Sequence, residues 1–227
     1  EEYRPYFFDP LGELIDHVPL LPCRGNHEGN GQAFRQVFDL PEGDPWYSCD
    51  CGPVHVVVLD TTGRRHAGEK DDVGRMVAWC DRDLAASTAP WRIVVHHEPC
   101  YDLGHRKDDW GHEDFLPLLR RHGVDLMLSS HAHGYQRLHP MVTPGENDDR
   151  PIVHVISAGA GATIGDRPLD ASPFLAAEAR RHHYVVFTVA RERLAARVLS
   201  DEDTLLDRFE IDKPGGRHTR AYLESAM

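Results

Sequence analysis

The sequence has no long apolar run, and its first residues have no leader-like pattern, which limits the classes of protein we expect it to belong to. Within 227 residues, no stretch approaches the ~18 consecutive apolar residues that a membrane-spanning helix needs. The first residues, Glu1-Glu2-Tyr3-Arg4-Pro5, lack the cationic and apolar regions of a signal peptide. We therefore expect a soluble chain with no membrane partner, and the sequence leaves its compartment open.

Cysteine is also scarce, which excludes a disulfide scaffold. The five cysteines are scattered and odd in number, so at least one thiol has no partner within the chain. They are Cys23, Cys49, Cys51, Cys80 and Cys100. Cys49-x-Cys51 lacks the two-residue spacer of zinc knuckles and redox motifs, which predicts two small strand residues. A local disulfide between them is the alternative.

Basic residues are outnumbered, with 25 Lys and Arg against 37 Asp and Glu and a formal net charge of −12. Such a surface is poorly suited to neutralising a phosphate backbone, so we expect no nucleic-acid partner. The length suits one large domain with a sizeable core. We expect this domain over residues 1–212 and a linker-like tail over 213–227, which contains Pro214-Gly215-Gly216.

The hydrophobic pattern predicts an α/β fold. Short, β-branched-rich runs at 18–22, 54–59, 91–95 and 124–128 are typical of buried strands. Helical periodicity occupies 73–84 and 115–121, so strands and helices alternate around a largely parallel sheet. After Arg137, strand-like runs at 151–157, 183–190, 194–199 and 205–211 predict an antiparallel half, with one possible helix over 173–181.

Histidine is abundant, at 16 residues, and its placement is regular. Three of the four strands expected in the first half lead directly into polar loops that contain histidine. These loops are Gly25-Asn26-His27-Glu28, His96-His97-Glu98-Pro99 and His131-Ala132-His133. Because the carboxyl ends of parallel strands gather at one edge of a sheet, we expect these distant loops to meet in space.

The residues Asn26, His27, His97, His131 and His133 offer imidazoles and one amide oxygen, which suit zinc, iron or manganese. Two histidines at i and i+2 in a loop can face two neighbouring ions, which favours a two-metal arrangement over a closed tetrahedron. Taken singly, each motif has a structural explanation, such as a Gly-Asn turn or a core histidine. Their shared position at strand ends favours a metal site.

Three segments resemble the last three of the five motif blocks of the calcineurin-like metallophosphoesterases. They are Gly25-Asn26-His27-Glu28, His97-x-Pro99-x-Tyr101 and His131-x-His133-x-Tyr135-x-Arg137. The Tyr135 and Arg137 positions, with the apolar strand before His97, make the sequence most similar to the purple acid phosphatase branch. The resemblance covers about residues 5 to 160. It implies a β-sandwich of mixed sheets flanked by helices, in agreement with the α/β pattern.

The resemblance also implies roles for individual residues. Asn26, His97 and His131 would bind one metal ion and His133 a second, with iron, zinc or manganese as the cofactor pair. His27 would be an outer histidine that meets the phosphate and donates a proton to the leaving oxygen. The implied activity is hydrolysis of a small phosphorylated substrate, of the acid phosphatase type.

The sequence departs from the family pattern in three ways. Ser130 replaces the glycine before His-x-His, which predicts a shifted loop conformation, and Gln136 replaces the usual glutamate. The first two blocks, an aspartate-bearing strand end and a Gly-Asp loop, are expected upstream of Gly25. Neither Asp9 nor Asp16 has that context. We therefore expect the later part of a catalytic domain, truncated before its bridging aspartate.

Other residues receive simpler interpretations. Tyr101, His105 and His112 lie at or within the polar loop 102–114 and are substrate-binding candidates on the leaving-group side; solvated loop residues are the alternative. Asp60 is predicted to cap a helix or turn. Gly159-x-Gly161 is predicted to form a turn near the site.

Two functional hypotheses follow. The first is a two-metal phosphoester hydrolase. The second is a catalytically incomplete domain of the same fold that serves as a binding or structural unit, which the missing upstream acids favour. A structural zinc module is disfavoured, because the motif positions are too many and too dependent on loops for a closed ligand shell.

Overall fold

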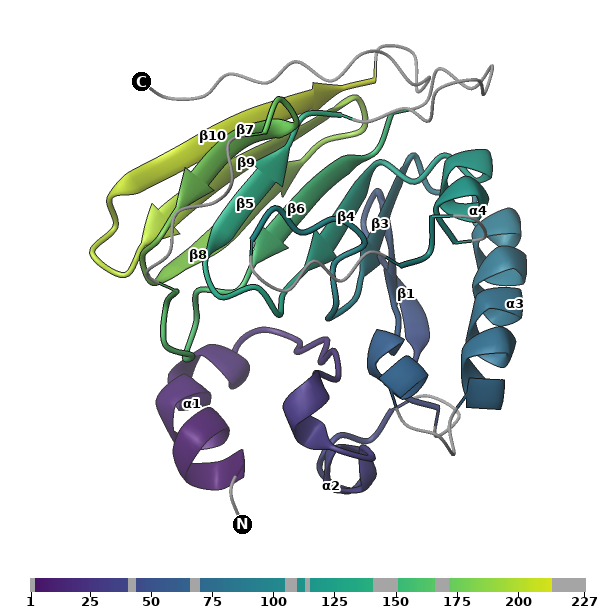
Figure 1. Ribbon diagram of the computed structural model, residues 1–227, viewed down its shortest axis with the longest axis horizontal. Helices are drawn as coiled ribbons and strands as arrows, with labels where there is room; N and C mark the ends of the chain where they lie inside the picture. The colour runs from purple at the N-terminus through teal and green to yellow at the C-terminus, as the bar shows by residue number, and fades with distance from the viewer. Residues whose placement is uncertain are drawn as a thin grey trace.

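The strands form two sheets that pack face to face, with helices on the outer face of the larger one (Figure 1). The computed structural model describes residues 3–40, 44–65, 70–104, 110–112, 115–140, 151–165 and 172–213. The helical segments are η1 (Arg4–Phe8), α1 (Asp9–Ile15), η2 (Asn26–Glu28), α2 (Gln32–Val37), η4 (Thr61–Arg65), α3 (Lys70–Ala86) and α4 (Phe115–Arg121). The strands are β1 (Tyr47–Cys51), β2 (Val54–Val58), β3 (Trp91–Val95), β4 (Leu126–Ser129), β5 (Tyr135–Leu138), β6 (Val153–Ser157), β7 (Leu175–Ala179), β8 (His183–Val189), β9 (Arg193–Ser200) and β10 (Leu205–Asp212).

The larger sheet is mixed and has the strand order β1-β2-β3-β4-β6-β5-β7. Its centre, β2, β3, β4 and β6, is parallel, while β1, β5 and β7 are antiparallel to their neighbours. The smaller sheet, β10-β9-β8, is antiparallel. The predicted α/β sandwich of sheets flanked by helices is therefore confirmed, and so is the antiparallel character of the last three strands.

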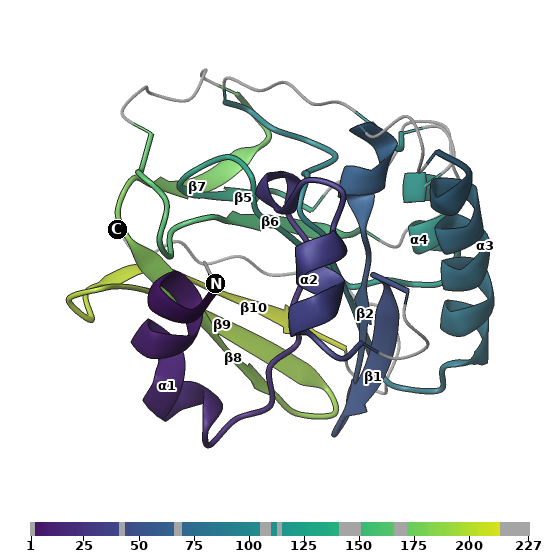
Figure 2. The same cartoon turned by 90° about the horizontal axis from the view of Figure 1, so that it is seen from below.

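The central strands are buried on both faces, which explains their nearly continuous apolar sequences. Side chains such as Val57 and Met127 pack under α3 and α4. Their neighbours, such as Leu126 and Val155, face the smaller sheet. In Figure 2, helices α3 and α4 lie on one side of the larger sheet and the smaller sheet lies on the other. Because side chains alternate between the two faces along a strand, the larger sheet buries one core against the helices and another against the smaller sheet.

Helix α3 confirms the predicted periodicity. Met76, Cys80 and Leu84 recur at four-residue spacing and are fully buried against the sheet. Such a spacing places all three on one face of a helix. Helix α4 begins and ends at the predicted residues, Phe115 and Arg121.

Residues 18–22 do not form the predicted strand. Val18, Leu20 and Leu21 are 45%, 39% and 37% exposed, and the described part of the chain provides no paired strand for this segment. Its two prolines have no N–H to donate to a neighbouring strand. The segment is instead anchored by the Tyr47 hydroxyl, which donates to the Pro22 carbonyl at 2.9 Å.

Two expectations for the second half were wrong. Residues 173–181 contain strand β7, not a helix, because 175–179 pair with β5. Leucine, alanine and glutamate favour helix intrinsically, but pairing with a sheet edge overrides that preference. Strand β6, assigned to the antiparallel half, is parallel to β4 and belongs to the centre of the larger sheet.

A buried ionic cluster joins the two sheets. Arg137 on β5 donates to Asp207 on β10 through Nε at 2.6 Å and Nη2 at 3.0 Å. The Tyr135 hydroxyl donates to the same carboxylate at 2.8 Å. Burial, with the adjacent Asp207 charge, raises the pKa of the Tyr135 phenol, which therefore stays protonated.

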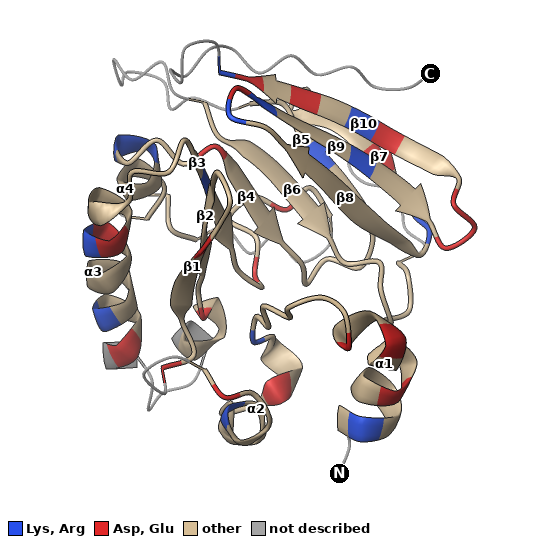
Figure 3. Ribbon diagram, turned by 180° about the vertical axis from the view of Figure 1, so that it is seen from behind, with Lys and Arg blue, Asp and Glu red and all other residues tan. Residues whose placement is uncertain are grey.

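Strands β9 and β10 of the smaller sheet carry charged residues of both signs (Figure 3). Arg193 on β9 pairs with Asp212 at 2.7 Å and with Glu210 at 3.3 Å on β10. Cross-strand pairs of opposite charge stabilise such a face modestly.

The two cysteines on β1 do not form a disulfide. Cys49 and Cys51 lie on this strand, as predicted for two strand residues, and their thiols share a hydrogen bond with the sulfurs 3.9 Å apart. Residues 214–227, most of the predicted tail, lie outside the described residues. Within the described residues, no helix combines the length and the apolar character that crossing a membrane requires.

Candidate metal centre

Donor atoms from three separate loops meet at the carboxyl-terminal edge of the parallel strands. Asn26 Oδ1 lies 2.7 Å from His97 Nε2 and 3.1 Å from His131 Nδ1. The two imidazole nitrogens are themselves 3.1 Å apart. His97 follows β3 and His131 follows β4, which is its parallel neighbour. The three loops therefore meet as predicted, although only His97 and His131 follow strands, because residues 18–22 before Asn26 do not form one. These three residues are here called the donor triad.

A short helical turn presents Asn26. In this turn, η2, the Gly25 N–H donates to Glu28 Oε2 at 2.8 Å, and Glu28 thus caps the turn with its own side chain. A Cβ on residue 25 would lie 3.0 Å from both Glu28 Oε2 and His97 Cε1. Glycine is therefore needed for the close approach of the turn to His97. The capping role of Glu28 was not predicted, although a Gly-x-x-Glu spacing is a signal for it.

A buried arginine anchors the same loop. The Arg24 side chain donates to Asp60 Oδ2 at 2.6 Å and to the Gly29 carbonyl. Asp60 Oδ1 also accepts the Thr62 N–H at 3.1 Å, at the start of η4. The predicted capping role of Asp60 is confirmed, and its ion pair with Arg24 fixes the loop to the end of β2.

His131 adopts a left-handed backbone conformation, with φ of 67°. This conformation is uncommon for residues other than glycine and is concentrated at functional sites. The Ala132 N–H donates to the Ser130 carbonyl at 2.7 Å, and the Ser130 N–H donates to the His97 carbonyl at 2.9 Å. Because the positive φ falls on His131 and not on residue 130, serine is accommodated there without strain.

The chemistry of the donor triad suits a metal ion. An amide oxygen only accepts hydrogen bonds, and a neutral imidazole has one N–H and one lone pair. Donor separations of 2.7 to 3.1 Å fit neighbouring ligands on one ion with bonds of ~2.0–2.1 Å. Among the described residues, no group of three or more His, Cys, Asp or Glu side chains has metal-binding geometry, so a third donor beside the two histidines would have to come from the Asn26 amide.

His133 lies in the same loop as His131 and is oriented by a backbone carbonyl. Its Nδ1 is 2.9 Å from the Thr163 carbonyl oxygen. Because a carbonyl only accepts, Nδ1 holds the proton and Nε2 keeps its lone pair for a ligand. The Gly159-x-Gly161 segment leads into this contact, as expected for a turn near the site. Thr163 was not predicted, since a backbone carbonyl has no side-chain signature.

The remaining candidates are His27, Tyr101, His112 and His105. His27 is exposed in the middle of η2. The half-buried Tyr101 ring meets His112 edge to face, with centroids 4.5 Å apart, and meets His154 at 5.1 Å. His112 Nε2 donates to the Cys100 carbonyl at 2.9 Å. His105 lies outside the described residues.

A hollow of about 420 Å³ opens beside the donor triad. Gly25, His97 and Ser130 line it on the side of the site, and Val185 and Phe187 line it from β8. Cys23 also contacts this hollow. Burial raises the pKa of its thiol to about 12, and the nearby Asp60 and Glu28 carboxylates add to the effect. Cys23 is therefore a neutral thiol and not a thiolate ligand.

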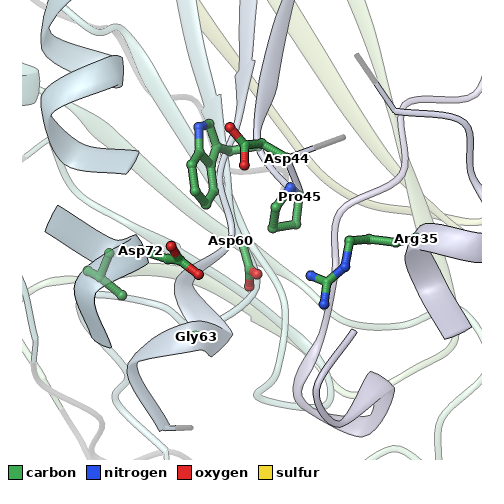
Figure 4. A pocket seen from close by; sticks show the side chains of 8 residues that line it. Arg35, Asp44, Pro45, Asp60, Gly63 and Asp72 are labelled. Atoms are coloured by element: carbon green, nitrogen blue, oxygen red, sulfur yellow. The ribbon is translucent and has the colours of Figure 1, made fainter. Parts of the chain in front are cut away.

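A second pocket, of about 240 Å³, lies near the end of β2 (Figure 4). Its lining includes Arg35 and the carboxylates of Asp44, Asp60 and Asp72. These acids are compensated, since Arg75 bonds Asp72 at 2.6 Å and Asp44 at 3.4 Å, and Arg24 bonds Asp60. No predicted site residue lines this pocket.

The amino-acid sequence of this chain is similar to those of known proteins. Residues 1–135 match the family described as Calcineurin-like phosphoesterase. Acid phosphatase type 7 of Homo sapiens is 30% identical over 194 residues, a match that covers 67% of this chain and 43% of that protein. Purple acid phosphatase 18 of Arabidopsis thaliana is 26% identical over 189 residues, covering 73% and 40%.

A solved structure has a similar fold. Purple acid phosphatase PPD1 from yellow lupin seeds superposes with a TM-score of 0.70 at 20% identity, covering 86% of this chain and 41% of that one. At this level of identity the similarity concerns the fold. The chain spans less than half the length of the relatives it matches.

Proposed function

Because this chain belongs to the calcineurin-like phosphoesterase family, we propose that it hydrolyses phosphoesters with a two-metal site. Asn26, His97 and His131 bind one ion, and His133 contributes Nε2 to the second. The observation that supports this most directly is the separation of 2.7 to 3.1 Å between donors that come from three loops. The imidazole and amide donors suit iron, zinc or manganese.

The chain's own residues orient the reaction. Metal ions held by these residues would supply positive charge that neutralises phosphoryl oxygens and favours in-line attack by water. The Thr163 carbonyl keeps the proton on His133 Nδ1, so that Nε2 faces outward as a ligand. His27, exposed beside Asn26, donates a proton to the leaving-group oxygen, a role for which imidazole is suited near neutral pH.

The substrate class follows from charge. A net charge of −12 repels polyanions at long range, although salt screens this beyond ~8 Å. Small phosphomonoesters are therefore preferred over nucleic acid. Tyr101 and His112, held together edge to face, serve the leaving-group side of the site. The same role is proposed for His105, which lies outside the described residues.

A second function has its own support. Only His133 is available to the second ion from the motif residues, and one imidazole does not hold a divalent cation against water. A domain that binds one ion and a phosphate group without turnover would have this donor set.

Metal analysis and kinetics test the proposal together. The purified chain should retain about one ion, at the donor triad, because the second ion has only His133 from the motif residues and should be held too weakly to survive purification. His131→Ala should lose that ion and the hydrolysis of an aryl phosphate, while His139→Ala, at an exposed position beyond β5, should lose neither. Retention of metal by His131→Ala would refute the donor triad.

The substrate assay compares an aryl phosphomonoester, an aryl phosphodiester and single-stranded DNA. The monoester should have the highest kcat/KM. Faster cleavage of DNA would overturn the monoesterase proposal and leave the metal site in place. Binding of inorganic phosphate with no turnover of any ester would favour the second function.

A further inference from the structure

Gln136 points away from the sheet interface that its neighbours occupy. On β5, Tyr135 and Arg137 face the smaller sheet and bond Asp207. Because side chains alternate along a strand, Gln136 faces the opposite side of the larger sheet. It is 4% exposed there, so its amide must find hydrogen-bond partners within the protein.

The partners of Gln136 belong to the loop that follows His97. Gln136 Nε2 donates to Asp102 Oδ1 at 3.1 Å, and Gln136 Oε1 accepts the Leu103 N–H at 3.3 Å. Asp102 Oδ1 also accepts the Gly104 N–H at 2.8 Å. Asp102 is 7% exposed. The amide of Gln136 and the carboxylate of Asp102 thus hold residues 102–104 in one conformation.

Only an amide meets both requirements of this contact. The Asp102 side needs a donor, and the Leu103 side needs an acceptor. A glutamate at position 136 would keep the acceptor but place two carboxylates about 3 Å apart in a buried location, where like charges are strongly unfavourable. The glutamine at this position, which departs from the family pattern, is therefore matched to Asp102.

The contact joins two loops of the candidate metal centre. Gln136 lies three positions beyond His133, and Asp102 lies five positions beyond His97. We propose that Gln136 is a positioning residue that fixes the His97 loop relative to the His131–His133 loop. This inference rests on the proposed metal-dependent function. Tyr101, between the two fixed points, is held in the same way on the leaving-group side.

Two substitutions separate the possible contributions. Gln136→Met removes both hydrogen bonds at similar volume, and Gln136→Glu keeps the shape but opposes Asp102 with a like charge. Gln36→Glu is the matched control, because Gln36 is exposed on α2. Thermal unfolding establishes which variants fold. Gln136→Met decides the outcome if Gln136→Glu does not fold.

Binding of Co²⁺, followed through its visible absorption, reports the geometry of the donor triad without any assay of activity. Misplaced supporting residues typically weaken metal binding by 10–100-fold, so Gln136→Met should bind Co²⁺ at least about tenfold more weakly and with shifted bands. Gln36→Glu should match the unsubstituted chain. Folded Gln136 variants with unchanged affinity and spectrum would overturn the inference.

Hydrogen exchange separates this inference from the proposed function. The Leu103 and Gly104 amides should exchange faster in Gln136→Met than in the control. If the unsubstituted chain takes up no Co²⁺, the metal proposal fails, and exchange alone decides the loop contact. Unchanged protection of Leu103 in that case would overturn the contact as well.

Discussion

Replacing Asp207 with alanine tests the ionic cluster that joins the two sheets. The substitution removes the carboxylate that accepts two bonds from Arg137 and one from Tyr135. The side chains of Arg137 and Asp207 are 0% and 2% exposed, so water cannot replace the lost partner. The guanidinium would remain charged in an apolar interior.

The expected cost follows from this burial. Removing one partner of a buried ion pair destabilises a protein by about 3–5 kcal/mol, because the other charge is left uncompensated. A typical domain has about 5–15 kcal/mol of total stability, so the variant should be close to unfolding at 37 °C. Replacing all three groups with apolar residues of similar volume, as Asp207→Leu with Arg137→Met and Tyr135→Phe, should restore most of the loss.

Urea unfolding followed by circular dichroism measures these differences. Asp212→Ala is the control, since its partner Arg193 is 57% exposed, and an exposed pair contributes less than about 1 kcal/mol. If Asp207→Ala costs no more than Asp212→Ala, the cluster does not stabilise the packing of the two sheets.

Three further substitutions have defined outcomes. His27→Ala should lower kcat by ~10²–10⁴-fold with unchanged metal content, and loss of metal would instead make His27 a ligand. Burial lowers the pKa of His154 to about 3, and the nearby His96 and Arg120 charges add to the effect. On acidification the unfolded chain therefore takes up this proton before the folded chain does. The free energy of unfolding should fall between about pH 6.5 and pH 3, by up to ~1.4 kcal/mol per pH unit. Denaturant titrations across this range should show a shallower acid loss in His154→Leu, and an equal loss would contradict the assignment. Gly159→Ala should cost about 1–3 kcal/mol in urea unfolding, because its Cβ would lie 2.0 Å from His183 Nδ1, whereas Gly161→Ala has open space and should be neutral.

Sequence pattern predicted those elements whose burial is decided locally. The strand at 91–95 and the helix at 73–84 have apolar spacing that leaves one solution for each. The predictions for residues 18–22 and 173–181 were wrong because pairing, not composition, decides whether a short run becomes a strand. The first segment has no partner among the described strands, and the second pairs with β5.

The sequence also predicted part of the candidate site, namely its donor residues but not the contacts that support them. His97 and His131 could be expected together because β3 and β4 end at the same sheet edge. Asn26 was grouped with them through a predicted strand at 18–22 that does not form. The contacts that support them could not be expected. Gln136 and Asp102 are 34 positions apart, and Arg137 and Asp207 are 70 apart. A polar residue in the sequence gives no indication of which distant group it will meet.

The spacing of the donor triad determines when the site can form during folding. Asn26 is 71 positions from His97 and 105 from His131, so the donors meet only after β3 and β4 have paired. Contacts of such range slow folding, and an ion cannot hold the same donors in the unfolded chain. An ion present at 100 times its Kd would add about 2.7 kcal/mol to the folded state. Under the proposed function, a bound ion therefore also stabilises the native state, before any substrate is encountered.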